Sequence, residues 1–285
     1  MILVTGGTGY TGRLLVRRLV GLGRPVRCLV RPTSERAELD GLGVDIVTGD
    51  LDDPDRARGA FAGVRYVFHL AHIRFASTLA ACLSEGVERA VLVSSLRRFS
   101  RVPSASVGEV IAGERAAEEA GTPCTVLRPS MIYGPGDDRN ISRLAARLRR
   151  HPLIPVFGGG RPLQQPVYVD DVVDAVLAAA ERPEAAGKGY ALAGPHALSY
   201  NQMIDLVGAA LGVRPVKLHL PVAVGRAALW ALRRVGISPG IDAEQILRLQ
   251  EDKAVSIAAA RQDLNFAPVS FEAGLARIYG RCQDL

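Results

Sequence analysis

The N-terminal segment constrains the fold of this chain more than any other part of it. Residues 2–5 form a short apolar run typical of a buried strand, and glycines follow at positions 6, 9 and 12. An apolar stripe of helical period then begins at Leu14. Glycines at this spacing let the backbone turn sharply and approach a pyrophosphate, and the following helix offers free N–H groups. This order of strand, loop and helix predicts a dinucleotide site on a Rossmann-type domain.

Short apolar runs recur along the next part of the chain and are mostly separated by helical patterns. We predict strands at residues 2–5, 26–30, 45–48, 66–70, 90–94 and 125–127. Continuous apolar runs of this kind are typical of a parallel sheet that helices cover on both faces. The predicted fold class is therefore α/β, a doubly wound parallel Rossmann sheet with a smaller, mostly helical C-terminal region.

The pattern changes after Pro129 and predicts a second region. An arginine-rich helix is expected at 140–150, and a short strand at 166–169. Asp170 or Asp171 would cap a helix at 172–181. We predict a dinucleotide-binding Rossmann domain at 1–136, completed by 166–182, and a smaller substrate or partner region at 137–165 and 183–285.

Composition narrows the functional classes. The chain lacks an apolar run long enough to span a membrane and shows no pattern of a signal peptide. The four cysteines, Cys28, Cys82, Cys124 and Cys282, form no CxxC pair, which favours reduced thiols in the cytoplasm and no metal site. The net charge is +6, but no dense basic block is interleaved with aromatic residues. Nucleic-acid binding is therefore not expected.

Five motifs together resemble one known family. They are TGGTGYTG at 5–12, GDL at 49–51, LVSS at 92–95, LRPSMIYGPGD at 127–137 and PVYVDDV at 166–172. This set resembles the extended and atypical branches of the short-chain dehydrogenase/reductases, which include epimerase-like proteins. The resemblance covers nearly the whole chain. Residues 158–172 and the tail from 198 are most similar to the atypical subgroup related to the 39-kDa-type accessory subunit of respiratory complex I.

The resemblance implies a set of cofactor-binding residues. Those expected to cradle the pyrophosphate are Gly6, Thr8, Gly9, Tyr10, Thr11 and Gly12. Those expected to border the adenine and the middle of the cofactor are Asp50, Leu51, Leu70, Ala71 and His72. Those expected near the nicotinamide are Ser94 and Ser95 at the end of the fifth strand, with Pro129, Ser130 and Met131.

The second strand decides which cofactor is expected. An NAD site usually has an acidic residue at this strand's end, which accepts a hydrogen bond from the ribose 2′-hydroxyl. Here the strand ends at Val30 and is followed by Arg31, with Arg13 available on the first helix. A guanidinium matches the 2′-phosphate of NADP. We therefore predict NADP(H) as the cofactor and rank NAD behind it; the alternative is that Arg31 is simply an exposed side chain.

The catalytic pair of the family is missing. Most members use Tyr-x-x-x-Lys on the helix after the fifth strand for proton transfer. The first lysine of this chain is Lys188, and no tyrosine lies between Tyr66 and Tyr133. With Glu114 matched to the family's helix glutamate, Ser106 and Val110 occupy the tyrosine and lysine positions.

Substitute catalytic groups are few. Ser94 or Ser95 could hydrogen-bond a substrate oxygen, or could instead cap backbone at the strand end. His72 is placed to titrate near the nicotinamide, or is a loop histidine with local partners. The arginines of the loop that follows, Arg97, Arg98 and Arg101, would border the substrate side and favour an anionic substrate, or form a solvated surface.

Three functions remain open. The first is an NADPH-dependent oxidoreductase acting on a small, anionic or electron-poor molecule. The second is a non-catalytic NADP(H) sensor or a protein that stabilises a partner in an assembly. The third is a sugar-nucleotide epimerase or dehydratase, which ranks last because that chemistry depends most on the absent tyrosine.

A helix expected at 221–235 is amphipathic and more typical of a cover over the core or cleft than of a membrane-bound helix. The oligomeric state is left open.

Overall fold

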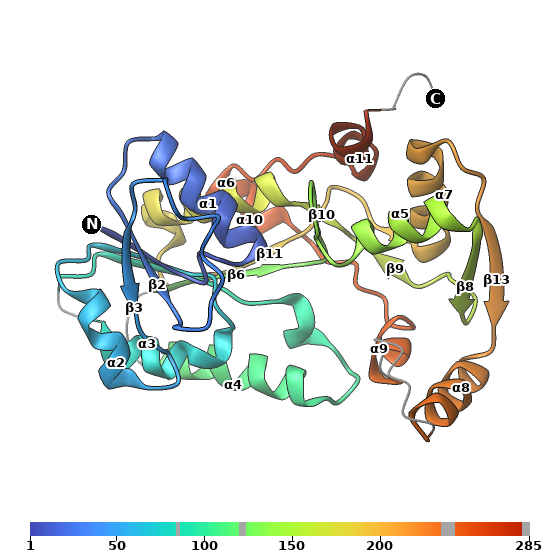
Figure 1. Cartoon of the computed structure of the whole chain (residues 1–285), viewed down its shortest axis with the longest axis horizontal. Coiled ribbons are helices and arrows are strands. Elements are labelled where there is room, and N and C mark those ends of the chain that lie inside the picture. The colour runs from blue at the N-terminus through green and yellow to red at the C-terminus, as the bar shows by residue number, and fades with distance from the viewer. Residues whose placement is uncertain (84–85, 120–123, 235–242, 281–285) are drawn as a thin grey trace.

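The computed structural model describes residues 1–83, 86–119, 124–234 and 243–280. Figure 1 shows two lobes side by side, a larger one built on a central sheet and a smaller one that contains the labelled elements α5, α7, α8, β8 and β13. The C-terminal part of the chain returns from the smaller lobe to the larger one before it ends.

The larger lobe contains a seven-stranded sheet in the order β11-β6-β5-β4-β1-β2-β3, and every neighbouring pair of these strands is parallel. The strands are β1 Ile2–Thr5, β2 Val26–Val30, β3 Asp45–Thr48, β4 Tyr66–His69, β5 Arg89–Val93, β6 Cys124–Pro129 and β11 Gly189–Leu192. The order reverses between β1 and β4. In open α/β sheets, ligands bind outside the carboxyl ends of the strands at such a point.

Helices cover both faces of this sheet, as the apolar strands predicted. One face packs against α1 Tyr10–Gly21, α6 Val169–Glu181 and α10 Ala258–Leu264, and the other against α2 Pro54–Arg58, α3 Ala76–Cys82 and α4 Ala105–Glu119 (Figure 1). Side chains alternate between the faces: Val4 belongs to the first core and Leu3 to the second. The predicted doubly wound Rossmann fold is confirmed.

The smaller lobe has a core of its own. Tyr133 is fully buried there and makes edge contacts with the rings of Tyr168 and Phe271. Its helices are α5 Ile141–Arg150, α7 Tyr200–Leu211, α8 Val222–Arg234, α9 Ala243–Arg248 and α11 Phe271–Tyr279. Its strands are β7 Ile132–Tyr133, β8 Leu153–Phe157, β9 Leu163–Gln164, β10 Val167–Tyr168, β12 Leu198–Ser199 and β13 Val216–Leu220. Short 3-10 helices are η1 Gly59–Phe61, η2 Ile73–Phe75, η3 Leu96–Phe99 and η4 Pro183–Ala185.

The structure differs from the sequence prediction in three places. The strand β11 is part of the main sheet, although residues 183–285 were assigned to the second region, and α10 also packs on this sheet. The strands β8 and β13 were not predicted. The cap prediction for α6 is wrong, because the helix begins at Val169 with Tyr168 as its N-cap and has Asp170 and Asp171 in its first turn. The exact division into domains stays a prediction.

The helix expected at 221–235 is present as α8, with residue 235 outside the described part of the chain. Trp230 is 61% exposed on it, whereas Leu229 is buried. Among the described residues, no helix is long and apolar enough to cross a membrane. Cys28 and Cys82 are buried, and Cys282 lies outside the described residues.

Candidate cofactor and substrate site

The glycine loop lies at the point where the strand order reverses. Gly6 follows β1 in the left-handed region, with φ of +74°. A Cβ at Gly6 would stand 2.5 Å from the backbone N of Ala71 and 2.6 Å from the carbonyl carbon of Leu70. The backbone N–H of Leu70 also donates to the carbonyl of Thr5 at 2.9 Å. The predicted residues from the ends of β1 and β4 therefore meet, and glycine is required for their close approach.

The first turn of α1 has the chemistry of an anion site. Gly9 is its N-cap, and a Cβ there would find only the carbonyl oxygen of Gly6 within reach, at 3.2 Å. A Cβ on Gly12 would collide with that same oxygen, so Gly12 lets the helix pack onto its own loop. Residues 10–13 include no carboxylate. Free N–H groups and the positive end of the helix dipole fit a pyrophosphate at this edge.

Tyr10 links this loop to the smaller lobe. Its hydroxyl donates to the carbonyl of Pro135 at 3.1 Å. Gly134 makes room for the link, because a Cβ there would come within 2.6 Å of the Tyr10 hydroxyl. Burial, followed by the charge of Asp138, raises the pKa of Tyr10. Tyr10 is therefore a neutral hydroxyl that holds together the two lobes beside the cofactor edge.

The expected adenine side combines one unpaired cation with a paired one. Arg31 follows β2 and is exposed, and among the described residues no ion pair involves its guanidinium. Arg13 instead forms an ion pair with Glu38 at 3.3 Å, and Arg17 binds the same carboxylate at 2.6 Å. Glu38 was not singled out in the sequence, because it lies in an irregular loop. Arg31 is thus free of a carboxylate partner among the described residues, as is Arg36, another exposed arginine of the same loop.

Asp50 and Leu51 follow β3 at the same edge of the sheet. Asp50 accepts a hydrogen bond from the backbone N–H of Asp52 at 3.0 Å, which fixes the turn. Leu51 is buried in the core beneath it. Gly49 allows β3 to approach α2, since a Cβ there would lie 2.5 Å from the carbonyl oxygen of Arg56. The GDL motif therefore shapes the edge largely through its backbone.

The two histidines after β4 have different environments. His69 is fully buried, its Nδ1 lies 2.7 Å from Thr5 Oγ1, and burial lowers its pKa to about 4. His72 is exposed and caps η2 by accepting from the N–H of Arg74 at 3.2 Å. Its other ring nitrogen lies 3.7 Å from Glu109. Desolvation, followed by Arg74 and Arg97, lowers the pKa of His72, while Glu109 opposes this shift.

Ser94 belongs to a charged network beneath the cleft. Its hydroxyl donates to Glu114, a fully buried carboxylate. Arg128 binds Glu114 through two nitrogens, the closer at 2.8 Å, and Arg98 binds it at 3.0 Å. This network joins β5, η3, α4 and β6. The sequence identified Glu114 only as an alignment position and gave no signal for these partners.

The other residues at this end of the sheet have local partners as well. Ser95 caps η3 by accepting from the N–H of Arg97 at 3.2 Å. Pro129 is buried at the end of β6, and the Met131 carbonyl accepts from the N–H of Val167 at 3.0 Å. Ser130 donates to the carbonyl of Gln165. The structure thus brings the predicted residues to one edge of the sheet and gives several of their polar atoms structural partners.

The positions expected for tyrosine and lysine lie on α4. Ser106 is half-buried in its first turn, 3.1 Å from the hydroxyl of Ser104. Arg248, the last residue of α9, donates to the Ser106 hydroxyl at 3.3 Å. Val110 is buried in the core beneath the sheet. The segment around Arg248 therefore approaches the start of α4 from the smaller lobe.

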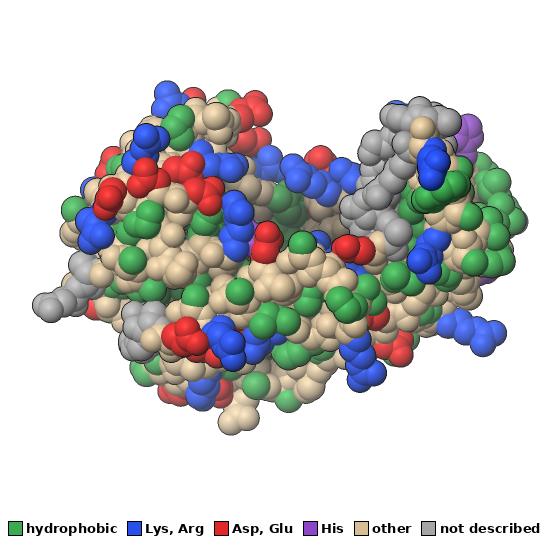
Figure 2. Space-filling view, turned by 90° about the horizontal axis from the view of Figure 1, so that it is seen from below, with side chains coloured by type: hydrophobic (Ala, Val, Ile, Leu, Met, Phe, Trp, Pro, Cys, Tyr) green, Lys and Arg blue, Asp and Glu red, His purple; other side chains and the backbone are tan. Residues whose placement is uncertain are grey.

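The three arginines of the loop 97–101 separate in the structure. Arg98 is held by Glu114, and the side chain of Arg101 is exposed while its N–H donates to Glu251 at 2.6 Å. Arg97 forms no ion pair with a carboxylate among the described residues; desolvation, followed by the charge of Arg248, lowers its pKa, and its own charge contributes to lowering the pKa of Lys253. Figure 2 shows a hollow between the two lobes with Lys and Arg side chains along its edge. We call Arg97, Arg248 and Lys253 the basic cluster.

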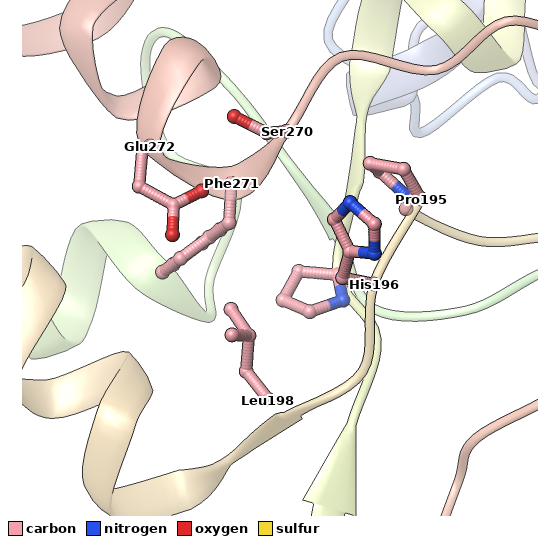
Figure 3. Close-up of a pocket in the computed structure, with 8 residues that line it drawn as sticks. Pro195, His196, Leu198, Ser270, Phe271 and Glu272 are labelled. Atoms are coloured by element: carbon pink, nitrogen blue, oxygen red, sulfur yellow. The ribbon is translucent and has the colours of Figure 1, made fainter.

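A separate pocket of about 240 Å³ is lined by other residues. It is formed by the loop after β11 and the start of α11; Figure 3 shows His196 and Leu198 opposite Phe271 and Glu272. None of its lining residues belongs to the glycine loop or the basic cluster. Among the described residues, no cluster of His, Cys, Asp or Glu could hold a metal ion.

Comparison with known proteins identifies the family. Residues 1–229 match the NmrA-like family, so the chain belongs to it. The chain is 30% identical to a 2-alkyl-3-oxoalkanoate reductase of Stenotrophomonas maltophilia, over 97% of this chain and 98% of that protein. It is 28% identical to the mitochondrial NADH dehydrogenase (ubiquinone) 1 alpha subcomplex subunit 9 of Dictyostelium discoideum, over 96% of this chain and 83% of that one.

Solved structures agree on the fold. The crystal structure of gox2253 has a TM-score of 0.78 at 24% identity and covers 98% of this chain and 97% of its own. A UDP-glucose 4-epimerase of Thermotoga maritima has a TM-score of 0.76 at 21% identity, with 98% and 97% covered. The expected membership in the atypical short-chain dehydrogenase/reductases is confirmed, and the chain belongs to an NAD(P)-binding, reductase-like family.

Proposed function

We propose that this protein is an NADP(H)-dependent reductase of small carbonyl compounds. The observation that carries the proposal is the glycine cradle at the reversal of the strand order. A hollow with Lys and Arg side chains along its edge lies between the two lobes (Figure 2). The name of the relative from Stenotrophomonas, a 2-alkyl-3-oxoalkanoate reductase, supports a carbonyl substrate that carries a carboxylate.

The chain's own groups fit NADPH at this edge. The N–H groups at the start of α1 would hold the pyrophosphate, and Arg31 would bind the 2′-phosphate. When bound, NADPH supplies the hydride for the carbonyl carbon. The residues after β4 and β6 would orient the reacting ring and exclude water from it. NAD ranks second because no acidic residue follows β2 directly.

Reduction here would proceed without the Tyr-x-x-x-Lys pair of the family. With Glu114 matched to the family's helix glutamate, Ser106 and Val110 stand at those positions, and Val110 is in the core. Hydride transfer depends mainly on the orientation of the reactants. An electron-poor carbonyl compound therefore requires less assistance from an acid on the protein. Hydride addition to its carbon would leave the negative charge on its oxygen, which would take a proton from solvent water.

The test is a reductase assay on the full chain. NADPH consumption is measured against 3-oxo acids, their esters, aldehydes, enones and quinones, and products are identified by mass spectrometry. We expect turnover of a carbonyl compound to the matching alcohol. A Gly9→Val variant, which should fold without binding the cofactor, is the control. If NADPH binds tightly and no compound in the panel is reduced, the proposed activity is wrong.

A second function is favoured by one specific observation. The three catalytic candidates all have structural partners: Ser94 binds Glu114, Ser95 caps η3, and His72 caps η2. A non-catalytic NADP(H)-binding protein that stabilises an assembly would need no free catalytic group, and the complex I subunits among the relatives support this reading. NADPH binding without turnover would favour it. The epimerase alternative ranks third, and cytoplasmic location stays a prediction.

A further inference from the structure

The basic cluster combines residues from two helices and from the irregular segment after the second, at the expected substrate side of the cleft. Arg97 lies in η3, directly after β5, and Arg248 ends α9. Lys253 follows on the extended segment after α9, where its N–H donates to the carbonyl of Leu163 at 2.8 Å. Glu251, which lies between Arg248 and Lys253 in the chain, is bonded to Ser100, Arg101 and Val102, so this segment lies against the loop that follows Arg97. Desolvation, followed by the charge of Arg248, lowers the pKa of both Arg97 and Lys253.

The nearby carboxylate is already engaged. Glu251 accepts from the Ser100 hydroxyl at 2.7 Å and from the N–H groups of Arg101 and Val102 at 2.6 and 3.2 Å. These bonds fasten the loop after η3 to the C-terminal segment. Among the described residues, no ion pair to a carboxylate is formed by Arg97, Arg248 or Lys253.

Like charges repel one another, and the repulsion grows as they lose water. Burial is the largest cause that lowers the pKa of Lys253, followed by Arg248, whereas Glu251 raises it. Arg97 is classed as exposed over the whole residue. Partial loss of water around its guanidinium is nevertheless the largest cause that lowers its pKa. An anion between these groups would remove the repulsion, and a guanidinium is suited to hold a carboxylate or phosphate.

We propose that Arg97, Arg248 and Lys253 form a subsite for the carboxylate or phosphate group of the substrate, beside Ser106 at the start of α4. This inference rests on the proposed reductase function and defines its substrate class as anionic. Arg248 also binds Ser106, the residue at the tyrosine position, so the anion would lie next to the place where the carbonyl is expected. The other lysines of the chain are paired: Lys188 with Asp263 at 2.8 Å and Lys217 with Asp205.

The first test measures occupancy without using activity. The chain has only three lysines, so acetylation of Lys188, Lys217 and Lys253 can be followed separately by peptide mass spectrometry. The protein is saturated with NADPH and then acetylated in the presence of one test compound at matched ionic strength. The test compounds are inorganic phosphate, acetoacetate, neutral methyl acetoacetate and chloride. We expect phosphate or acetoacetate to slow labelling of Lys253 about fivefold or more, with no change at the other two lysines.

Two variants control this measurement. Arg248→Met should abolish the protection, whereas Arg115→Met, which removes an exposed cation from α4, should retain it. Protection by phosphate alone would identify a phosphate ligand, and protection by acetoacetate a carboxylate ligand. Equal protection by chloride or by the neutral ester, protection of all three lysines, or full protection by NADPH alone would each overturn the subsite.

The second test separates this inference from the proposed function. The substrates are a reducible 3-oxo acid and its methyl ester. Lys253→Met should raise KM for the acid about tenfold, without changing kcat for the acid or either kinetic constant for the ester. If neither compound oxidises NADPH, the reductase function fails, and the labelling result still decides on anion binding. If both are reduced and Lys253→Met affects them equally, the subsite is wrong while the reductase function stands.

Discussion

The proposed cofactor half of the cleft is built from the backbone of consecutive residues, whereas the proposed substrate half is built from side chains that are distant in the sequence. In the first, residues 6–12 and the ends of β1 and β4 supply close backbone contacts and free N–H groups. In the second, Arg97 and Ser106 meet Arg248 and Lys253 only because the C-terminal segment returns to the larger lobe. The first half should therefore be broken by adding a single Cβ, and the second by removing a charge.

The largest effect is expected from Gly12→Val. The added side chain would collide with the carbonyl oxygen of Gly6 and force α1 away from the loop. Because backbone lies on both sides of the collision, we expect a loss of about 3 kcal/mol or more in the free energy of unfolding, together with loss of NADPH binding. Denaturant unfolding and fluorescence titration with NADPH measure the two effects.

Gly9→Val is the matched variant in the same loop. Its Cβ would meet only the oxygen of Gly6, at 3.2 Å, so the protein should keep most of its stability and still lose cofactor binding. This pair of variants distinguishes a glycine that the fold requires from one that the ligand requires. A folded Gly9→Val protein that binds NADPH normally would falsify the placement of the pyrophosphate at this loop.

Glu114→Ala should have the next largest effect and tests the side-chain half. It would leave Arg128 and Arg98, which are 14% and 28% exposed, without their shared carboxylate and Ser94 without its acceptor. Removing one partner of a buried charged network costs about 3–5 kcal/mol. We expect a clear fall in Tm, with NADPH affinity nearly unchanged.

The control for this variant is Glu119→Ala on the same helix. Glu119 forms an exposed pair with Arg115, and its removal should change Tm little. Equal effects of Glu114→Ala and Glu119→Ala would mean that the buried network does not stabilise the substrate half. A large loss of NADPH affinity with unchanged stability would contradict the separation of the two halves.

The same contrast explains how much the sequence could predict. The glycine loop and the strands at 2–5, 26–30 and 45–48 depend on local patterns and were predicted at their observed bounds. The strand β11 was missed because it begins with a glycine and has further glycines on either side, and it pairs with β6 only in the folded chain. The partners of Glu114, Arg248 and Lys253 could not be predicted, because they come from segments that are distant in the sequence and meet only in the folded chain. The one available signal was the rarity of lysine, which makes Lys253 conspicuous.

The smallest effect is expected at the adenine end, where the cofactor half depends on a side chain. Arg31→Ala should weaken NADPH binding about tenfold and leave NADH binding unchanged, because only NADPH carries the 2′-phosphate. The effect is limited by the exposure of Arg31 to solvent. Arg36→Ala removes another exposed cation from the same loop and is the control. Calorimetric titration with both cofactors measures the change in affinity. If Arg31→Ala and Arg36→Ala weaken NADPH binding equally, Arg31 acts only through the general charge of the loop, and the assignment of the 2′-phosphate to Arg31 is wrong.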